Sequence, residues 1–214
     1  ALGLIRVHEA LARSSNLVSV RVLQHTGTPT ARAWLGRFGL DPARQPDDLT
    51  LALGTGSVTP MQMAQAYATL ANGGRLRQPS LIKGALNPPL SVLDPVIAGQ
   101  IVTMLESVTG DQGTGKSARV ANYRIAGKTG TSRKASASGY ASRYVASFAG
   151  FAPVSNPRIV CVAVINDPTG DEYYGGLVAA PLFANVVEGA LRLMNIPPDD
   201  YERLLVGAGG EAAP

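Results

Sequence analysis

The sequence predicts an α+β protein in which an antiparallel β-sheet is flanked by helices. Apolar residues recur at helical spacing through most of the first 108 residues. The period then changes, and two apolar runs at 144–151 and 159–165 are typical of strands joined by short, turn-rich segments. A last amphipathic segment at 181–193 indicates a closing helix. Helices followed by neighbouring strands and one more helix favour an antiparallel sheet with helices packed against it.

Five helices are expected before the strands, and residues that favour helix ends set their limits. Thr28-Pro29, Thr59-Pro60 and Asp94-Pro95 each combine an N-capping side chain with a proline suited to the first turn. The break Ser14-Ser15-Asn16 separates the first two helices, and Asn72-Gly73-Gly74 ends the fourth. The expected helices span residues 4–11, 17–23, 28–38, 61–70 and 95–105.

The remaining segments are shorter or less regular. Residues 41–57 are loop-like, because prolines and glycines cluster there. Short strands are expected at 76–82 and 123–127 from their apolar and β-branched residues. The tail at 199–214 becomes rich in glycine and alanine and is expected to be flexible.

The composition is that of a globular protein, with 45% hydrophobic and 16% charged residues among 214. The net charge is +4, the basic residues are scattered and 6% of residues are aromatic, which argues against nucleic-acid binding. No apolar run approaches the ~20 residues that a membrane-spanning helix needs. The chain starts at Ala1 in the middle of a pattern, so we expect a piece of a longer protein. The lone Cys161 lies in an apolar run and is expected to be a small buried hydrophobe.

One motif resembles a nucleotide site. Gly110–Ser117 matches the phosphate-loop pattern G-x-x-x-x-G-K-[ST]. Phosphate binding by such a loop needs a strand directly before it and a helix directly after, whose first amides hold the phosphates. Here a helical segment ending near Val108 leads in, and the segment 118–123 that follows is short. We therefore expect a surface turn and no nucleotide.

A second motif resembles a nucleophile. Ser80-Leu81-Ile82-Lys83 is the one S-x-x-K in the sequence, the spacing that serine acyl-transfer enzymes use at the start of a helix. At that position the lysine shares a face with the serine and takes its proton. Pro79 before it and Gly84 after it leave no room for a helix. We expect a structural role for this segment.

Two further motifs carry chemistry when they are taken together. Ser14-Ser15-Asn16 lies between two expected helices, and Lys128-Thr129-Gly130-Thr131 lies at the end of an expected strand. Each pattern alone is common. An S-x-N followed by a strand-borne K-T-G forms the second and third signatures of the serine acyltransferases that include β-lactamases and penicillin-binding proteins.

Longer stretches resemble the class B, monofunctional transpeptidases among the penicillin-binding proteins, most closely the division-specific members. The resemblance covers about residues 3–198, and a Gly-Thr-Gly turn upstream of K-T-G is common in that family. The first signature of the family, an S-x-x-K with the acylated serine, is absent from this sequence. The resemblance therefore implies the C-terminal, incomplete part of a transpeptidase domain at 1–198. The similar stretches are 57–74, 126–132, 147–153, 164–168, 173–176 and 179–183.

The resemblance implies roles for three catalytic side chains. In the family, a serine attacks the penultimate D-Ala carbonyl of a peptidoglycan stem peptide, and an amine of a second stem then takes the acyl group. By this resemblance, Ser14 relays a proton between the absent lysine and the leaving nitrogen. Asn16 would hold the substrate amide and orient that lysine. Lys128 would place positive charge near Ser14 and the terminal carboxylate of the substrate.

The resemblance also implies a substrate-binding strand. Thr129 and Thr131 would offer hydroxyls to the carboxylate, and the N–H of Thr131 would be one oxyanion-hole donor. Gly130 would let the substrate lie against the strand edge, because a side chain there would intrude. Arg133 and the pair Tyr173-Tyr174 are expected to line the cleft, although core packing is an equal alternative for the tyrosines.

The resemblance finally implies surroundings for the whole protein. Its partners would be stem peptides, β-lactam antibiotics and cell-division membrane proteins, without cofactor or metal. Its place would be the periplasmic face of the bacterial inner membrane, with an anchoring helix upstream of these residues. Two alternatives stay open: a non-catalytic penicillin-recognising or scaffold module, and a β-lactamase-related hydrolase.

Overall fold

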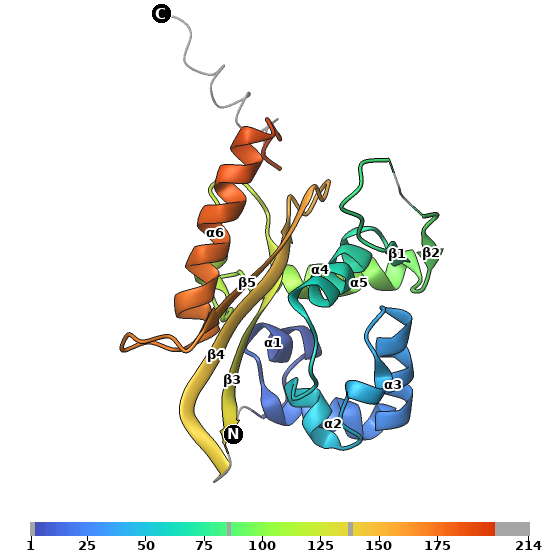
Figure 1. The fold of residues 1–214 in the computed structure, drawn as a ribbon, viewed down its shortest axis with the longest axis vertical. Coiled ribbons are helices and arrows are strands. Elements are labelled where there is room, and N and C mark those ends of the chain that lie inside the picture. The colour runs from blue at the N-terminus through green and yellow to red at the C-terminus, as the bar shows by residue number, and fades with distance from the viewer. Residues whose placement is uncertain (1–2, 85–86, 137–138, 200–214) are drawn as a thin grey trace, which may run out of the picture.

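The computed structural model describes residues 3–84, 87–136 and 139–199 and confirms the predicted α+β class (Figure 1). Within these residues, five α-helices precede the three strands of the main sheet and one α-helix follows them, as the sequence indicated. The helices are α1 Val7–Ala12, α2 Asn16–Thr26, α3 Thr28–Arg37, α4 Pro60–Ala71, α5 Pro95–Ser107 and α6 Gly175–Leu193. The strands are β1 Arg75–Leu76, β2 Leu90–Ser91, β3 Ala126–Ser136, β4 Gly139–Ala152 and β5 Ile159–Asn166. Short 3-10 helices are η1 Pro42–Arg44, η2 Leu49–Leu53 and η3 Lys116–Ala118.

The main sheet has the order β3-β4-β5, and both pairings are antiparallel. Ser147 in β4 lies opposite Gly130 in β3 and opposite Val164 in β5, which fixes the register across the sheet. The long helix α6 covers one face of this sheet, whereas α1, α4 and α5 lie on the other (Figure 1). Since β3 is an outer strand of this three-stranded sheet, one of its backbone edges faces away from β4.

The core between α6 and β4 follows from the two sequence periods. Side chains alternate along β4, so Phe148 points toward α6, while Ser147 points to the opposite face. Along α6 the fully buried residues are spaced about four apart, which places them on one stripe of the helix. Phe148 packs against Phe183 with ring centroids 4.6 Å apart. The buried stripe of α6 consists of Ala179, Phe183, Val187 and Leu191.

Three predicted elements differ from the structure. The helix α6 begins at Gly175 and carries Pro181 inside it, although the sequence had placed a helix start at that proline. Burial of Ala179 and Ala180 extends the packed stripe upstream, and this packing outweighs the hydrogen bond that a proline removes. The strand β3 begins at Ala126 and continues to Ser136 as a hairpin with β4, so the K-T-G lies within the strand and not at its end.

The strand predicted at 76–82 is also wrong. The pairing stops after Arg75–Leu76, which faces Leu90–Ser91. Ser80 Oγ accepts a hydrogen bond from the N–H of Ile82, which closes a local turn in place of a ladder. This turn carries the S-x-x-K pattern, and the pattern therefore has none of the helical context that a nucleophile of this type needs.

The phosphate-loop pattern has the wrong flanks as well. Helix α5 ends at Ser107, shortly before Gly110–Ser117, and the three-residue η3 Lys116–Ala118 includes the last two residues of the pattern. A three-residue 3-10 helix offers no stack of N-terminal amides for a phosphate. The turn is held by the N–H of Gly115, which donates to the carbonyl of Val108 at 2.9 Å.

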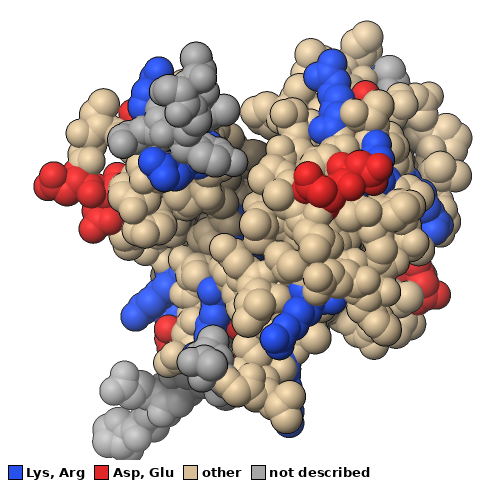
Figure 2. Space-filling model, turned by 90° about the horizontal axis from the view of Figure 1, so that it is seen from below, with Lys and Arg blue, Asp and Glu red and all other residues tan. Residues whose placement is uncertain are grey.

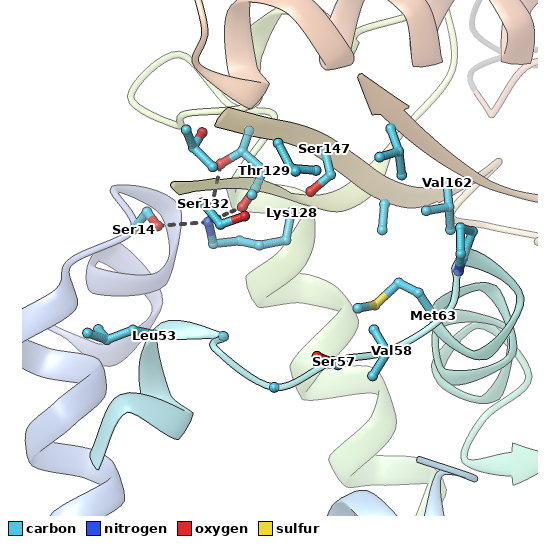
Figure 3. A pocket seen from close by; sticks show the side chains of 18 of the residues that line it. Ser14, Leu53, Ser57, Val58, Met63, Lys128, Thr129, Ser132, Ser147 and Val162 are labelled. Atoms are coloured by element: carbon cyan, nitrogen blue, oxygen red, sulfur yellow. Dashed lines mark hydrogen bonds between the residues drawn. The ribbon is translucent and has the colours of Figure 1, made fainter. Parts of the chain in front are cut away.

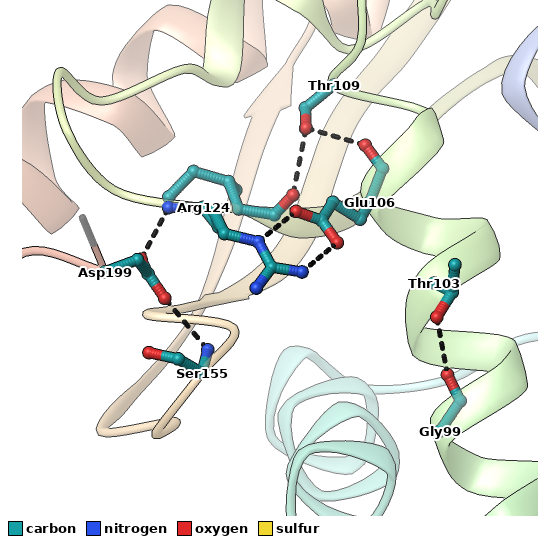
Figure 4. Close-up of polar contacts among 8 residues, drawn as sticks. Gly99, Thr103, Glu106, Thr109, Arg124, Ser155 and Asp199 are labelled. Carbon is teal, nitrogen blue, oxygen red and sulfur yellow. Dashed lines mark hydrogen bonds and ion pairs between the residues drawn. The ribbon is translucent and has the colours of Figure 1, made fainter. Parts of the chain in front are cut away.

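The entry into β3 is braced by polar contacts (Figure 4). Arg124 donates to both carboxylate oxygens of Glu106 in α5, at 2.6 and 2.7 Å. Such bidentate pairs add orientation as well as energy. Asp199 accepts the N–H groups of Arg124 and Ser155, at 2.6 and 2.9 Å, and Thr109 donates to the carbonyls of Glu106 and Ile125. The sequence predicted a flexible tail at 199–214. Of this segment only Asp199 belongs to the described residues.

Helix α6 is long and apolar enough, by length and composition, to cross a membrane, and it is the one such helix among the described residues. A core helix passes the same test, and one stripe of α6 is fully buried against the sheet. On the face shown in Figure 2, basic and acidic side chains are interspersed over the surface.

Candidate active site

A cavity of about 730 Å³ lies between the β3–β5 face of the sheet and the helices α1, α2 and α4 (Figure 3). One end is polar and holds Ser14, Asn16 and Lys128. The other end is apolar and is lined by residues of α4, β4 and β5. These apolar lining residues are Met63, Tyr67, Val145, Val162 and Val164.

Ser14 lies in a special backbone position at the end of α1. The N–H of Ser14 bonds to the carbonyl of Leu11 and the N–H of Ser15 to that of Ala10, the two hydrogen bonds of a Schellman helix end. This motif places its residue after the C-cap in the left-handed region, where glycine is usual. Ser14 has φ +53° there. A non-glycine residue in this region is strained, and such strain is frequent at functional positions.

The hydroxyl of Ser14 is in contact with the lysine of the K-T-G (Figure 3). Lys128 Nζ donates to Ser14 Oγ at 2.9 Å, although the two residues are 114 positions apart in the sequence. Partial burial lowers the pKa of the Lys128 ammonium from its usual value near 10.5 to about 8. At neutral pH the group is therefore still mainly charged.

The remaining ammonium hydrogens of Lys128 hold the next residue of the strand. Lys128 Nζ donates to the carbonyl of Thr129 at 3.0 Å and to Thr129 Oγ1 at 3.2 Å. Thr129 Oγ1 also lies 2.8 Å from Thr114 Oγ1, on the turn that resembles a phosphate loop. Thus Ser14, Lys128 and Thr129 form one hydrogen-bonded group at the polar end of the cavity.

Gly130 and Thr131 extend this group along β3. A Cβ added to Gly130 would lie 2.4 Å from Ser147 Oγ, so a hydroxyl of β4 already fills the space that a side chain would need. The sequence had attributed this glycine to the approach of a substrate, and the structure adds a cause within the sheet. Thr131 Oγ1 accepts the N–H of Gly175 at 2.9 Å. The hydroxyl hydrogen of Thr131 is therefore still available to an acceptor in the site.

Asn16 is the first residue of α2 and lines the polar end of the same cavity, close in sequence to Ser14. The structure thus brings Ser14, Asn16, Lys128, Thr129, Gly130 and Thr131 to one cavity. Their catalytic and binding roles stay predictions.

Arg133, Tyr173 and Tyr174 do not line this cavity but lie further along β3 and at the start of α6. The Tyr173 ring stacks on Tyr144 at 4.0 Å, and the Tyr174 ring lies 4.5 Å from that of Tyr173. The Arg133 guanidinium carbon lies 5.9 Å from the Tyr144 ring centroid. A hydrogen bond to Tyr174 raises the pKa of Tyr173 to about 12. These residues form an aromatic wall beside the strand, and their contact with a substrate stays a prediction.

Asp167 supports this wall from the end of β5. It has φ +54°, and its N–H donates to the carbonyl of Tyr144 at 2.9 Å. Asp167 Oδ2 accepts from Lys134 at 2.6 Å and also from Arg143, and these two cations hold the pKa of the carboxyl below its usual value.

The sequence interpretation missed several residues of the cavity. Ser132 shares a strand face with Lys128, which the period of two along β3 indicates once the strand is extended. Ser147, in contrast, is brought opposite Gly130 by strand pairing, for which the sequence alone held no signal. Among the described residues, no group of three or more His, Cys, Asp and Glu side chains is placed to hold a metal ion.

The fold and the site together define a class: an α+β domain of the penicillin-binding and β-lactamase-like type, with the S-x-N serine and the K-T-G lysine in contact. The family model for the penicillin binding protein transpeptidase domain matches residues 2–188. The chain belongs to this family, and the resemblance seen in the sequence is confirmed.

Curated relatives and solved structures agree with this assignment. The chain is 43% identical over 172 residues to peptidoglycan D,D-transpeptidase FtsI of Escherichia coli K12, and the alignment covers 76% of this chain and 29% of the relative. It is 36% identical over 214 residues to the probable peptidoglycan D,D-transpeptidase PbpC of Pseudomonas aeruginosa, and this alignment covers 90% of this chain and 38% of the relative. The apo transpeptidase domain of Burkholderia pseudomallei penicillin-binding protein 3 superposes with a TM-score of 0.82 at 30% identity, covering 93% of this chain and 67% of that chain. The chain thus spans 29–38% of the length of these two curated relatives.

Proposed function

We propose that the full-length protein is a serine-type peptidoglycan D,D-transpeptidase and that these residues supply its S-x-N and K-T-G signatures. The observation that carries the proposal is the 2.9 Å contact between Lys128 Nζ and Ser14 Oγ at the rim of a large cavity. A structural lysine at this position would not need a serine held in the strained left-handed region. The names of the relatives support the same activity.

The proposed reaction has two acyl transfers. A serine upstream of these residues attacks the penultimate D-Ala carbonyl of a stem peptide, and the bond from that carbon to the terminal D-Ala nitrogen breaks. The serine proton reaches the leaving nitrogen, and an ester links the peptide to the enzyme. An amine of a second stem peptide then attacks the ester, a new amide forms, and the serine regains a proton.

Ser14 and Lys128 serve the proton transfers in this scheme. The Ser14 hydroxyl both accepts and donates, so it can pass a proton from the nucleophile side to the leaving nitrogen. The Lys128 ammonium keeps positive charge beside that hydroxyl and attracts the terminal carboxylate of the acyl donor. Partial burial removes part of the hydration of this ammonium, which lowers the pKa of Lys128 to about 8 and leaves less water for a ligand to displace.

The edge of β3 binds the peptide. An extended stem peptide adds alongside an outer strand through backbone hydrogen bonds, and β3 has β4 on one edge only. The N–H of Thr131 would stabilise the oxyanion, and the hydroxyls of Thr129 and Thr131 would donate to the carboxylate. Asn16 would hold the substrate amide from the opposite rim, while Arg133, Tyr173 and Tyr174 would contact the far end of the peptide.

β-Lactams would acylate the same serine, and no cofactor, nucleotide or nucleic acid takes part. Cell-division membrane proteins are the proposed partners, and the septum at the periplasmic face of the inner membrane is the proposed place, with an N-terminal helix as anchor. The basis of this assignment is the resemblance of the sequence to the division-specific members of the family.

The test is acylation of the full-length protein by a fluorescent penicillin, with the labelled peptide mapped by mass spectrometry. We expect one adduct on a serine of an upstream S-x-x-K and release of D-Ala from a stem-peptide substrate. Residues 1–214 alone should not be labelled. An adduct on Ser14 or Ser80, or no adduct on the full-length protein, would refute the proposal. Rapid hydrolysis of penicillin without cross-linking would identify a β-lactamase-related hydrolase.

A further inference from the structure

The Gly113-Thr114-Gly115 turn, which the proposed function does not yet use, touches two elements of the site, α1 and β3, and also the start of α6. The N–H of Thr114 donates to the carbonyl of Ala12 at 3.0 Å, two residues before Ser14. Thr114 Oγ1 lies 2.8 Å from Thr129 Oγ1 in β3. A Cβ added to Gly176 in α6 would lie 2.2 Å from the carbonyl oxygen of Thr114. The turn therefore spaces α1, β3 and α6 relative to one another.

The two glycines fix this turn against the core. A Cβ on Gly113 would lie 1.9 Å from the carbonyl oxygen of Val108, and a Cβ on Gly115 would lie 2.8 Å from the ring of Phe148. Contacts this close do not occur for real Cβ atoms, so the backbone approaches the core as only glycine allows. Thr114 is consequently presented to Thr129 from a rigid support.

The hydrogen count at Thr129 decides what this contact does. A threonine hydroxyl has one hydrogen and two lone pairs. Thr129 Oγ1 already accepts a hydrogen from Lys128 Nζ at 3.2 Å. When Thr114 donates as well, both lone pairs of Thr129 Oγ1 are used, and its own hydrogen is directed to an acceptor other than Thr114. When Thr129 donates to Thr114 instead, that hydrogen is lost to a ligand.

We propose that Thr114 is a positioning residue that donates its hydroxyl hydrogen to Thr129 Oγ1 and thereby turns the Thr129 O–H toward the carboxylate of the acyl donor. The inference rests on the proposed transpeptidase function. It assigns a role in recognition of acyl donors with a free C-terminal carboxylate to a turn that, by its pattern, resembles a nucleotide site. Thr114 acts through Thr129 and does not itself touch the reacting atoms.

The test compares two forms of one β-lactam, the free acid and its methyl ester, on the full-length protein. Thr114→Val keeps the branched shape and the backbone hydrogen bond but removes the hydroxyl. We expect it to lower the second-order acylation rate constant for the free acid about five- to tenfold, the contribution of one hydrogen bond between neutral groups. The rate for the ester should stay within about twofold of the wild type. Thr114→Ser should restore the free-acid rate.

Thr103→Val is the matched control, because the exposed Thr103 hydroxyl donates to the carbonyl of Gly99 in its own helix (Figure 4) and Thr103 does not line the cavity. It should leave both rates unchanged. Thr114→Val should also have no further effect in a Thr129→Val background, since the two hydroxyls act as one unit. If the thermal unfolding curve shows that Thr114→Val is not folded, Thr114→Ala gives the same comparison without a β-branched side chain.

Any of three results would overturn the inference. These are an equal loss of acylation rate for the acid and the ester, additive effects of Thr114→Val and Thr129→Val, and no rescue by Thr114→Ser. In those cases Thr114 only shapes the turn, and the transpeptidase proposal is untouched as long as the wild type is acylated. A wild type that no β-lactam acylates would refute the proposed function, and the inference with it.

Discussion

The two faces of the β3–β5 sheet are built for different tasks. On the α6 face, Phe148 and Phe183 are fully buried and pack ring against ring. On the opposite face, the neighbouring Ser147 lines a cavity of about 730 Å³ together with Lys128 and Val162. Adjacent residues of one strand therefore serve either packing or chemistry, because strand side chains alternate between faces. Substitutions on the first face should change the free energy of unfolding, and substitutions on the second should change the reaction.

The largest expected effect lies on the packed face. Phe183→Ala removes a ring with no exposed surface and leaves a cavity against Phe148, so we expect a loss of about 3–5 kcal/mol in the free energy of unfolding. Urea denaturation monitored by circular dichroism measures it. Leu182→Ala, one residue away and 42% exposed, is the control and should stay within about 0.5 kcal/mol. Similar losses in both variants would contradict the assignment of the packed face.

Lys128→Ala should have the second largest effect, and on the reaction instead of the fold. We expect penicillin acylation of the full-length protein to slow by about 100-fold or more, which corresponds to about 3 kcal/mol of barrier. The unfolding midpoint should stay near that of the wild type. Lys116→Ala, on the exposed 3-10 helix η3, should leave acylation unchanged. Equal small effects would mean that Lys128 is only a surface charge.

Ser14 should separate stability from function within one residue. Ser14→Gly relieves the left-handed backbone at φ +53°, so we expect the unfolding free energy to rise by about 1 kcal/mol. Ser14→Ala keeps the strain and should show no such gain. Both variants lose the hydroxyl and should slow acylation. Calorimetry measures the unfolding free energy, and penicillin acylation rates measure the loss of function. A Ser14→Gly variant that is less stable than the wild type would contradict the backbone strain inferred at Ser14.

The last expected effect is a dependence of stability on pH. Partial burial lowers the pKa of folded Lys128 to about 8, whereas the unfolded chain retains a value near 10.4. Between these values the unfolded chain binds a proton that the folded protein lacks, so stability contributed by this group rises with pH. Between pH 8 and pH 10, the unfolding free energy from urea titrations should change less with pH in Lys128→Met than in the wild type. A wild-type curve that falls relative to Lys128→Met across this window would reverse the sign of the shift.

Local patterns predicted much of the fold. The N-cap of α4 is a complete capping box, in which Thr59 Oγ1 accepts the N–H of Gln62 and Gln62 Oε1 accepts the N–H of Thr59. Asp94 caps α5 in the same way that its sequence position indicated. The motif residues Ser14 and Lys128 were also placed in one site before the structure. The two caps depend on short spacings that the sequence contains directly, whereas the shared site of Ser14 and Lys128 was predicted from the family resemblance.

The features that the sequence interpretation missed depend on contacts between distant segments. A proline is typical of a helix start, so the sequence predicted one at Pro181. The packing that extends α6 upstream of it comes from the sheet, and neighbouring residues in the sequence do not indicate it. Ser147 joined the cavity through strand register. Thr114 was set aside with the phosphate-loop pattern, although its hydroxyl contacts Thr129. No local pattern carries this information.

The wide sequence separation between Ser14 and Lys128 has a consequence for how the site assembles. Thr114 and Thr129 are 15 positions apart, whereas Ser14 and Lys128 are 114 positions apart. Closing the longer loop costs about 2 kcal/mol more in chain entropy, more than a single hydrogen bond returns. Ser14 therefore reaches Lys128 only once α1 has packed on α5. We therefore expect the threonine pair to form early during refolding and the contact between Ser14 and Lys128 to form late.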